Sequence, residues 1–342
     1  MATDCEFSSF SSQSEESSPK KVQSVESSSN EIRNWLELPS DVTCLILKKL
    51  GTIEILTSAQ RVCKLWWKLC KDPAMWRTID MSTTEDSWDM DYDPEVIVRN
   101  AVDRSCGELV DINIEYFGTD RLMEYITART SNLKRLRLVS CCISDECLSD
   151  AAKRLPLLED LEISLCFFTR ESLEVVGRCC PCLRTLKYNK RGYRRPRVEC
   201  DEEALAIAEC MPELRYLQFF GNKLTNDGLE AILDGCPHLE YLDLRRCFNI
   251  TLPGDLGRRC AERLKTLRCP NDPTDDYEFR AQNLDGSVDE DYHVMSDIFS
   301  SDEYDDYDYD YDDIGFSSDE YWDHVYNYDF DYVSSDGGDL GA

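Results

Sequence analysis

The chain has 342 residues, enough for one or two domains with a buried core, and it carries a net charge of −30. It contains no apolar run long enough to span a bilayer and no secretory leader, so we expect a soluble protein of the nucleus or cytoplasm without a membrane partner. Eighteen cysteines in a chain of this length, with no signal peptide, predict reduced thiols rather than a disulfide framework.

The first segment, residues 1–33, is rich in serine and glutamate and contains few large apolar residues. Such a segment cannot bury enough apolar surface to offset the entropy lost on ordering its backbone. We therefore expect it to be disordered.

Residues 34–80 predict a compact group of short helices. Pro39 suits the first turn of a helix, because its missing N–H is not needed there, and Gly51 is a usual stop. Apolar residues recur at three- and four-residue steps within two helical stretches, namely Val42, Leu45, Ile46 and Leu50, then Val62, Leu65, Trp66 and Leu69. So few residues cannot hide this much apolar surface alone.

The order of motifs in this stretch is more restrictive than its periodicity. Leu-Pro-x-Asp starts at Leu38, Val-Cys-Lys-x-Trp starts at Val62, and Asp-Pro-x-x-Trp ends at Trp76. This order resembles the F-box, although the family more often has Glu where this chain has Asp41. In that family the motif docks onto the Skp-family adaptor of cullin–RING ubiquitin ligases. The resemblance implies adaptor contacts by Leu38, Pro39, Val42, Ile46, Leu50, Val62 and Trp66.

A repeated Leu-x-x-apolar-x-apolar signature dominates the rest of the chain. It starts at Leu109, Leu133, Leu158, Leu183, Leu214, Leu239 and Leu264, with spacings of 24, 25, 25, 31, 25 and 25 residues. The alternation predicts a short strand in each unit, followed by a helical pattern. In three units this pattern ends at Cys180-Pro181, Met211-Pro212 or Cys236-Pro237. Residues 76–81 carry the same spacing, which predicts a degenerate opening repeat that begins inside the F-box.

These units resemble the cysteine-containing leucine-rich repeat, and their order after an F-box resembles plant F-box/LRR proteins. The resemblance implies an α/β fold with a helical F-box at residues 34–80 and a short leucine-rich-repeat solenoid at residues 76–270, whose repeats are stabilised by stacking. Residues 271–342 hold 24 acidic residues and one basic residue, and so carry −23 of the net charge. We expect this tail to be disordered.

The cysteines do not predict a metal site. Cys141, Cys166 and Cys247 each lie eight residues after the leading Leu of their repeat, which is the position of a small core side chain. Four converging ligands are needed for zinc, and we expect neither metal nor cofactor. With three histidines, no phosphate-binding loop and no nucleophile–base signature, the chain is expected to be non-catalytic.

The strand face that the helices do not cover, here called the open face, is the expected functional surface. Alternation places the second, fourth and sixth residues after each leading Leu on it. Mixed charge is ordinary for a solvated face, whereas neighbouring aromatics often anchor interfaces. The candidate target contacts combine residues of this face with two arginines of an insertion: Arg135, Arg137, Lys187, Arg194, Arg195, Tyr216, Phe220, Tyr241 and Arg245.

The insertion at residues 190–197 holds five basic residues on an otherwise acidic chain. Three partners stay open for it: an acidic protein, nucleic acid, or the acidic tail of the chain itself. One short loop is thin support for nucleic acid, so we do not expect that partner.

Taken together, the two resemblances imply the substrate-recognition subunit of a Skp–cullin–F-box ubiquitin ligase. The F-box would hold the adaptor, and through it a cullin–RING complex, while the repeats hold an unidentified protein substrate. Two other functions stay open. The chain could be an F-box scaffold whose bound proteins are not degraded, or an acidic nuclear interaction protein that acts through its C-terminal tail.

Overall fold

The computed structural model describes residues 38–82, 92–192, 198–252 and 254–279 of the chain. All the described helices and strands belong to a single contact unit that begins at Pro39. No helix among the described residues is long and apolar enough to cross a bilayer. The predicted disordered segment 1–33 and residues 280–342 of the predicted tail lie outside the described residues.

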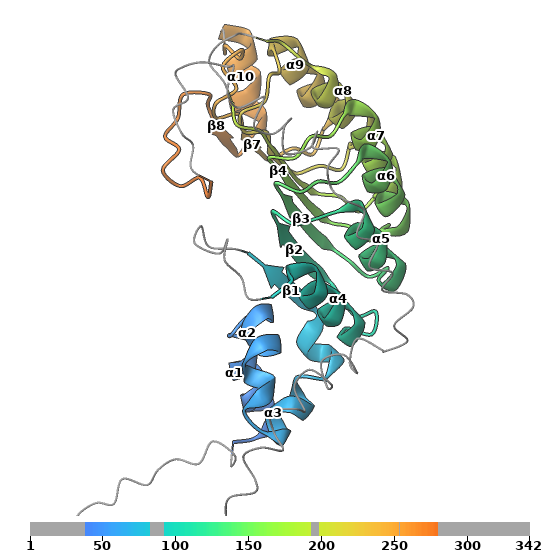
Figure 1. Cartoon of the computed structure of the whole chain (residues 1–342). Coiled ribbons are helices and arrows are strands. Elements are labelled where there is room, and N and C mark those ends of the chain that lie inside the picture. The colour runs from blue at the N-terminus through green and yellow to red at the C-terminus, as the bar shows by residue number, and fades with distance from the viewer. Residues whose placement is uncertain (1–37, 83–91, 193–197, 253, 280–342) are drawn as a thin grey trace, which may run out of the picture. The chain divides into compact units, whose positions relative to one another are not determined.

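A group of short helices opens the described chain (Figure 1). Its elements are α1 Ser40–Leu47, α2 Thr52–Thr57, η2 Ala59–Arg61, α3 Lys64–Leu69 and η3 Pro73–Trp76. Cys63 Sγ accepts the Trp66 N–H at the start of α3, and the Asp72 carboxylate accepts the Ala74 N–H at the start of η3. These caps satisfy backbone donors that a helix start leaves unpaired.

Trp76 joins the helical group to the strand that follows it. Its side chain is 1% exposed, and its indole N–H donates to the Cys70 carbonyl oxygen at 2.7 Å. The Asp80 N–H donates to the Thr52 hydroxyl, and Arg104 donates to the Gln60 side chain at 3.0 Å. The helical group and the first repeat therefore share one continuous core.

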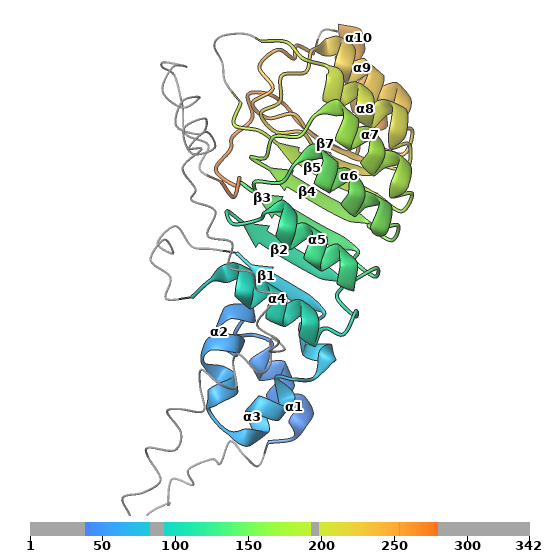
Figure 2. The same ribbon diagram turned by 45° about the vertical axis from the view of Figure 1, so that its right-hand side comes forward.

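The rest of the fold is an eight-stranded parallel sheet in sequence order, with a helix between successive strands (Figure 2). The strands are β1 Thr78–Met81, β2 Asp111–Glu115, β3 Arg135–Val139, β4 Asp160–Ser164, β5 Thr185–Asn189, β6 Tyr216–Gln218, β7 Tyr241–Asp243 and β8 Thr266–Arg268. The helices are α4 Pro94–Arg104, α5 Asp120–Arg129, α6 Asp145–Arg154, α7 Arg170–Cys179, α8 Glu202–Cys210, α9 Asn226–Gly235 and α10 Gly254–Arg263. All the helices lie on one face of the sheet, which leaves the opposite, open face uncovered by helices.

The register of the sheet follows the leucine signature. Each of β2 to β8 begins two residues after a leading Leu, and each leading Leu is buried. Since equivalent residues pair across every strand, as Leu136 pairs with Ile112 and with Leu161, the apolar positions stack into a continuous core. The predicted α/β class, with a helical group followed by a parallel repeat solenoid, is confirmed.

Acidic residues near the helix starts link successive repeats. The Asp120 carboxylate accepts the Ser144 N–H at 2.7 Å, and Asp201 accepts the Thr225 N–H at the same distance. Asp145 accepts the Thr169 N–H at 2.8 Å. Because each carboxylate bonds to the residue that caps the next helix, neighbouring repeats are held in the same relative position.

The cysteines that follow the leading Leu by eight residues are core residues. Cys141, Cys166 and Cys247 are buried, and the cysteines of the described residues are free thiols. Burial raises the pKa of Cys180 and of Cys236 to about 12, so both remain protonated at neutral pH. Among the described residues, no group of three or more Cys, His, Asp or Glu side chains is arranged to hold a metal ion.

Candidate protein-binding surfaces

Helix α1 turns its apolar stripe outward. Its buried residues are Thr43 and Leu47, whereas Val42 is 40% exposed and Leu45 is 64% exposed. A surface helix normally buries this stripe against its own core. The outward stripe therefore indicates a surface made to be covered by another molecule.

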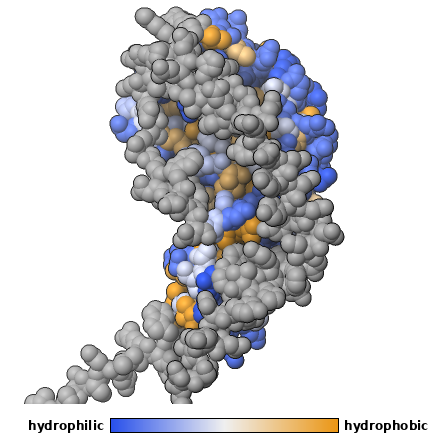
Figure 3. All heavy atoms as spheres, in the orientation of Figure 1, coloured by the Kyte–Doolittle hydropathy of each residue, from blue (hydrophilic) through white to orange (hydrophobic). Residues whose placement is uncertain are grey.

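Other large apolar side chains of the helical group are also exposed. The exposed apolar residues of this group, here called the F-box surface, are Val42, Leu45, Leu50, Val62 and Trp67, five of the nine large apolar side chains exposed in the described residues. Figure 3 shows apolar side chains at the surface of the helical group. Such a concentration on a small group of helices is typical of an interface.

The predicted adaptor residues differ in how exposed they are. Pro39, Val42, Leu50 and Val62 are exposed, while Leu38, Ile46 and Trp66 are half-buried. Trp66 packs partly against the core, and its neighbour Trp67 is the more exposed indole. Leu45 and Trp67 are absent from the predicted contact set, although the helical spacing of Leu45 had already placed it on the same stripe. The roles of all these residues stay predictions.

On the open face, charged residues of successive strands pair with one another. Arg135 lies 2.7 Å from Asp111, and Lys187 lies 2.8 Å from Glu162. Arg137 lies 3.2 Å from Glu162 and 3.6 Å from Glu115. The face is therefore a cross-strand network of alternating charge.

The predicted aromatic residues of this face adopt two different arrangements. Tyr216 and Tyr241, neighbours on β6 and β7, are half-buried and stack with ring centroids 4.0 Å apart and planes 4° apart. Phe220 was expected to be exposed, and this expectation is wrong: it is 1% exposed. The ring of Tyr277 covers it, with centroids 3.8 Å and planes 7° apart.

Tyr277 belongs to a stretch that the sequence placed in the disordered tail. Residues Asn271–Phe279, here called the returning segment, instead lie against the open face, so the predicted boundary at residue 271 is wrong for these residues. The physical reason is that acidic and aromatic side chains of the segment meet complementary groups of strands far back in the sequence, a gain that the local composition cannot show.

Two arginines hold the middle of the returning segment. The Arg245 guanidinium forms ion pairs with Asp243 at 2.7 Å and with Asp276 at 2.6 Å, and it donates to the Pro273 carbonyl oxygen at 3.0 Å. Arg268 lies 3.2 Å from Asp276. The hydrogen bond from Arg268, reinforced by Arg245, lowers the pKa of Asp276 despite an opposing effect of burial.

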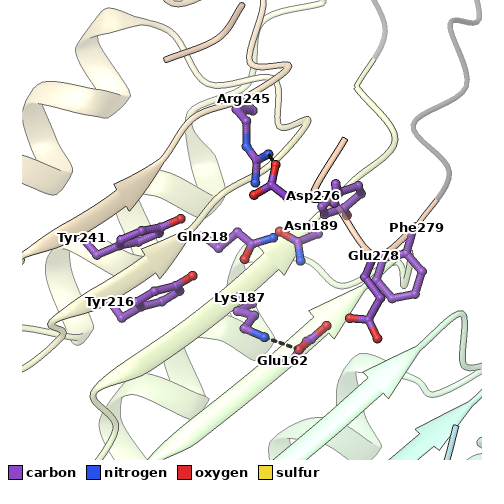
Figure 4. Close-up of a pocket in the computed structure, with 11 residues that line it drawn as sticks. Glu162, Lys187, Asn189, Tyr216, Gln218, Tyr241, Arg245, Asp276, Glu278 and Phe279 are labelled. Carbon is purple, nitrogen blue, oxygen red and sulfur yellow. Dashed lines mark hydrogen bonds and ion pairs between the residues drawn. The ribbon is translucent and has the colours of Figure 1, made fainter. Parts of the chain in front are cut away.

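The end of the segment reaches β3. The Glu278 carboxylate lies 2.7 Å from Arg137, and the same guanidinium lies 5.7 Å from the centre of the Phe279 ring. Between the segment and the strands is a hollow of about 210 Å³ (Figure 4). The side chains that line it are Glu162, Lys187, Asn189, Tyr216, Gln218, Tyr241, Arg245, Asp276, Tyr277, Glu278 and Phe279.

The structure thus brings six of the predicted target contacts to the hollow or to the returning segment. They are Arg137, Lys187, Tyr216, Phe220, Tyr241 and Arg245. Arg135 lies on the same face but pairs with Asp111 instead. Arg194 and Arg195 lie outside the described residues. Sequence reasoning did not find residues 276–279, whose acidic and aromatic side chains were the one signal that could have indicated this contact.

Comparisons with known proteins agree with both halves of this architecture. An F-box-like model matches residues 35–82, a leucine-rich-repeat model of FBD-associated F-box proteins matches residues 96–202, and a leucine-rich-repeat model matches residues 211–233. F-box protein SKIP19 of Arabidopsis thaliana is 52% identical over 283 residues, which cover 82% of this chain and 90% of that protein.

F-box/LRR-repeat protein 23 of Arabidopsis thaliana is 54% identical over 273 residues, which cover 75% of this chain and 60% of that protein. Among solved structures, a chain of the yeast Rad7 and Elc1 complex has a TM-score of 0.41 and 17% identity, covering 67% of this chain and 59% of that one. This structural similarity is too low to bear on function.

Proposed function

Because this chain belongs to the F-box/LRR-repeat family, we propose that it is the substrate-recognition subunit of a Skp–cullin–F-box ubiquitin ligase. The F-box surface binds the Skp-family adaptor, and the open face of the repeats binds the target protein. Ubiquitin transfer is performed by the partner complex, so this chain contributes proximity rather than chemistry and acts in the nucleus or cytoplasm.

The outward apolar stripe of α1 is the observation that carries this proposal. Exposed Leu45 and Val62 lie in elements that are fixed to the repeat core through Trp76. An apolar helical surface that a partner covers is a standard mode of recognition, and burying it supplies the affinity. The rigid connection to the sheet would then hold a bound target at a defined place relative to the adaptor.

Adaptor binding by the full chain tests this proposal. We expect the double variant Leu45→Asp, Val62→Asp to bind a purified Skp-family adaptor at least about 100-fold more weakly, because interface anchors typically contribute about 2 kcal/mol or more each. Leu38→Ala with Pro39→Ala should weaken binding as well, since it removes a predicted anchor and the residue that precedes α1.

Phe167→Asp is the matched control, because Phe167 is 72% exposed but lies in the repeats. It should leave adaptor affinity unchanged, and all variants should keep the circular dichroism of the parent chain. Undiminished adaptor binding by the Leu45→Asp, Val62→Asp variant would contradict the proposal. A target whose half-life does not change when the chain is removed would favour the scaffold function instead.

A further inference from the structure

The returning segment is a peptide bound to the open face by its own chain. Three kinds of contact hold it: acidic Asp276 against Arg245 and Arg268, aromatic Tyr277 against Phe220, and acidic Glu278 against Arg137. Figure 4 shows the acidic residues of the segment turned toward the strands and Arg245. The open face therefore distinguishes acidic from aromatic positions along the returning segment, which turns at Thr274–Tyr277.

The strand residues in these contacts come from separate repeats. Arg137 lies on β3, Phe220 lies just beyond β6, Arg245 lies just beyond β7 and Arg268 ends β8. Since the repeats hold these positions in register, the spacing between the cationic and aromatic positions is fixed before any peptide binds. A preorganised set of contacts of this kind favours a short linear sequence over a folded surface.

We propose that the open face is a binding site for a linear acidic–aromatic–acidic–aromatic peptide, and that the returning segment is an intramolecular occupant which a target protein of this chemistry displaces. The inference rests on the proposed function, because it names the class of target that the repeats recognise. It assigns recognition to Arg137, Phe220, Arg245 and Arg268, and it assigns to Asp276–Phe279 the role of a competitor.

Two features of the returning segment make it replaceable by a better ligand. The Tyr277 hydroxyl is buried and has no hydrogen-bond partner among the described residues, so a phenylalanine at this position avoids an uncompensated loss of hydration. The hollow of about 210 Å³ beside the segment is bordered by the Tyr216–Tyr241 stack and offers a target side chain contacts beyond those that the segment makes. A target with phenylalanine in the central position and a side chain in the hollow would bind more tightly.

The sequence repeats this order of side chains in its tail. Tyr328-Asp329-Phe330 repeats the tyrosine–acidic–phenylalanine pattern of Tyr277-Glu278-Phe279. The full acidic–aromatic–acidic–aromatic order recurs at Asp306–Tyr309, Asp308–Tyr311 and Asp329–Tyr332. A test must therefore remove all these segments as competitors. The open variant is the full chain with alanine in place of Tyr277, Phe279, Tyr307, Tyr309, Tyr311, Tyr328, Phe330 and Tyr332.

The probe is a fluorescent peptide that copies residues 273–279, and its affinity is measured by anisotropy. We expect the open variant to bind it at least about tenfold more tightly than the parent chain, since a tethered competitor acts at an effective concentration near the millimolar range. A probe with phenylalanine in place of its tyrosine should bind about 3- to 10-fold more tightly still, because it removes the unpaired hydroxyl.

Arg137→Gln and Arg135→Gln form a matched pair in the open variant. Both side chains lie on β3 and pair with neighbouring acids, but only Arg137 contacts the segment. We expect Arg137→Gln to weaken probe binding at least about fivefold and Arg135→Gln to leave it unchanged, with the same thermal unfolding midpoint for both.

Equal probe affinity for the parent chain and the open variant overturns the inference, and so do equal effects of the two arginine substitutions. Adaptor binding is measured on the same preparations. The peptide site on the open face and the proposed ligase function are thereby tested separately. If the open variant binds the adaptor but not the probe, the proposed peptide site is contradicted and the proposed ligase function is not. Probe binding without adaptor binding supports the peptide site and contradicts the proposed ligase function.

Discussion

The F-box surface and the open face differ in polarity and in how far the chain itself covers them. The first is apolar and exposed, as Leu45 and Val62 show. The second is charged, its residues pair across strands, and the returning segment lies over Phe220. An apolar surface gains affinity directly when it is covered, whereas a charged surface must first exchange its existing partners.

This difference implies different control of the two binding events. Because the F-box surface is exposed among the described residues, the proposed adaptor binding should be constitutive. Target binding at the open face competes with the returning segment and depends on charge, so target concentration and ionic strength set its extent.

The largest expected effect is at the junction of the two regions. Trp76 is 1% exposed, whereas Trp67 is 41% exposed on the F-box surface. Trp76→Ala should lower the free energy of unfolding by about 3–5 kcal/mol, because it leaves a cavity in the core common to both regions. Trp67→Ala should change it by less than about 1 kcal/mol.

Chemical denaturation of the full chain measures both variants. If Trp76→Ala were as mild as Trp67→Ala, the shared core would carry little stability and the two regions would be independent. In that case the fixed distance between adaptor and target would lose its structural basis.

Ionic strength should separate the two binding events. Raising salt from about 50 mM to about 500 mM shortens the screening length from about 14 Å to about 4 Å, which weakens the contacts of Arg137 and Arg245 with acidic ligands. We expect probe binding by the open variant to weaken about tenfold and adaptor binding to change less than about twofold. Adaptor binding that falls with salt as steeply as probe binding would remove the contrast.

Truncation of the returning segment tests its contribution to stability. From composition alone, a cut after Pro273 should leave the unfolding temperature unchanged. The structure predicts that the free energy of unfolding falls by about 1–2 kcal/mol, because the cut removes the Tyr277–Phe220 stack. The cut also removes the exposed ion pairs of Asp276 and Glu278. Thermal unfolding should therefore shift down by about 2–6 °C, and an unchanged midpoint would show that the segment is not held.

The smallest expected effect is that of pH. The pKa of Asp276 lies below its ordinary value of 3.8, so its ion pairs stabilise the closed segment fully above that value and lose this effect as the pH falls through the lowered pKa. Among the described residues, those that pair or stack with the segment include no histidine. Probe affinity for the parent chain should therefore be constant between about pH 5.5 and about pH 8, measured by anisotropy at fixed ionic strength.

Much of the fold could be predicted from local sequence because the same pattern of residues recurs in each repeat. Leu133 and Leu158 occupy equivalent positions, and each fixes the strand that begins two residues later. Strand alternation then placed Arg137, Tyr216 and Tyr241 on the open face, where the structure has them. These inferences needed only the period of the pattern and the geometry of a strand.

The returning segment could not be predicted in this way. Its acidic residues and scarce aliphatics are typical of a chain that does not order itself. The contacts that hold Glu278 and Tyr277 come from Arg137 and Phe220, which are distant in sequence. Only the register of the assembled sheet brings those partners together.

One chain should join the adaptor and the target through two separate surfaces, and simultaneous binding of the adaptor and the probe to one molecule tests this. The open variant is mixed with a Skp-family adaptor and the fluorescent probe, and sedimentation of the labelled species is followed. The account predicts a complex that contains one copy of each component, with the same probe affinity whether or not the adaptor is bound. Mutual exclusion of adaptor and probe, or sedimentation of the probe without the adaptor at saturating adaptor concentration, would contradict the claim that one chain joins the two through separate surfaces.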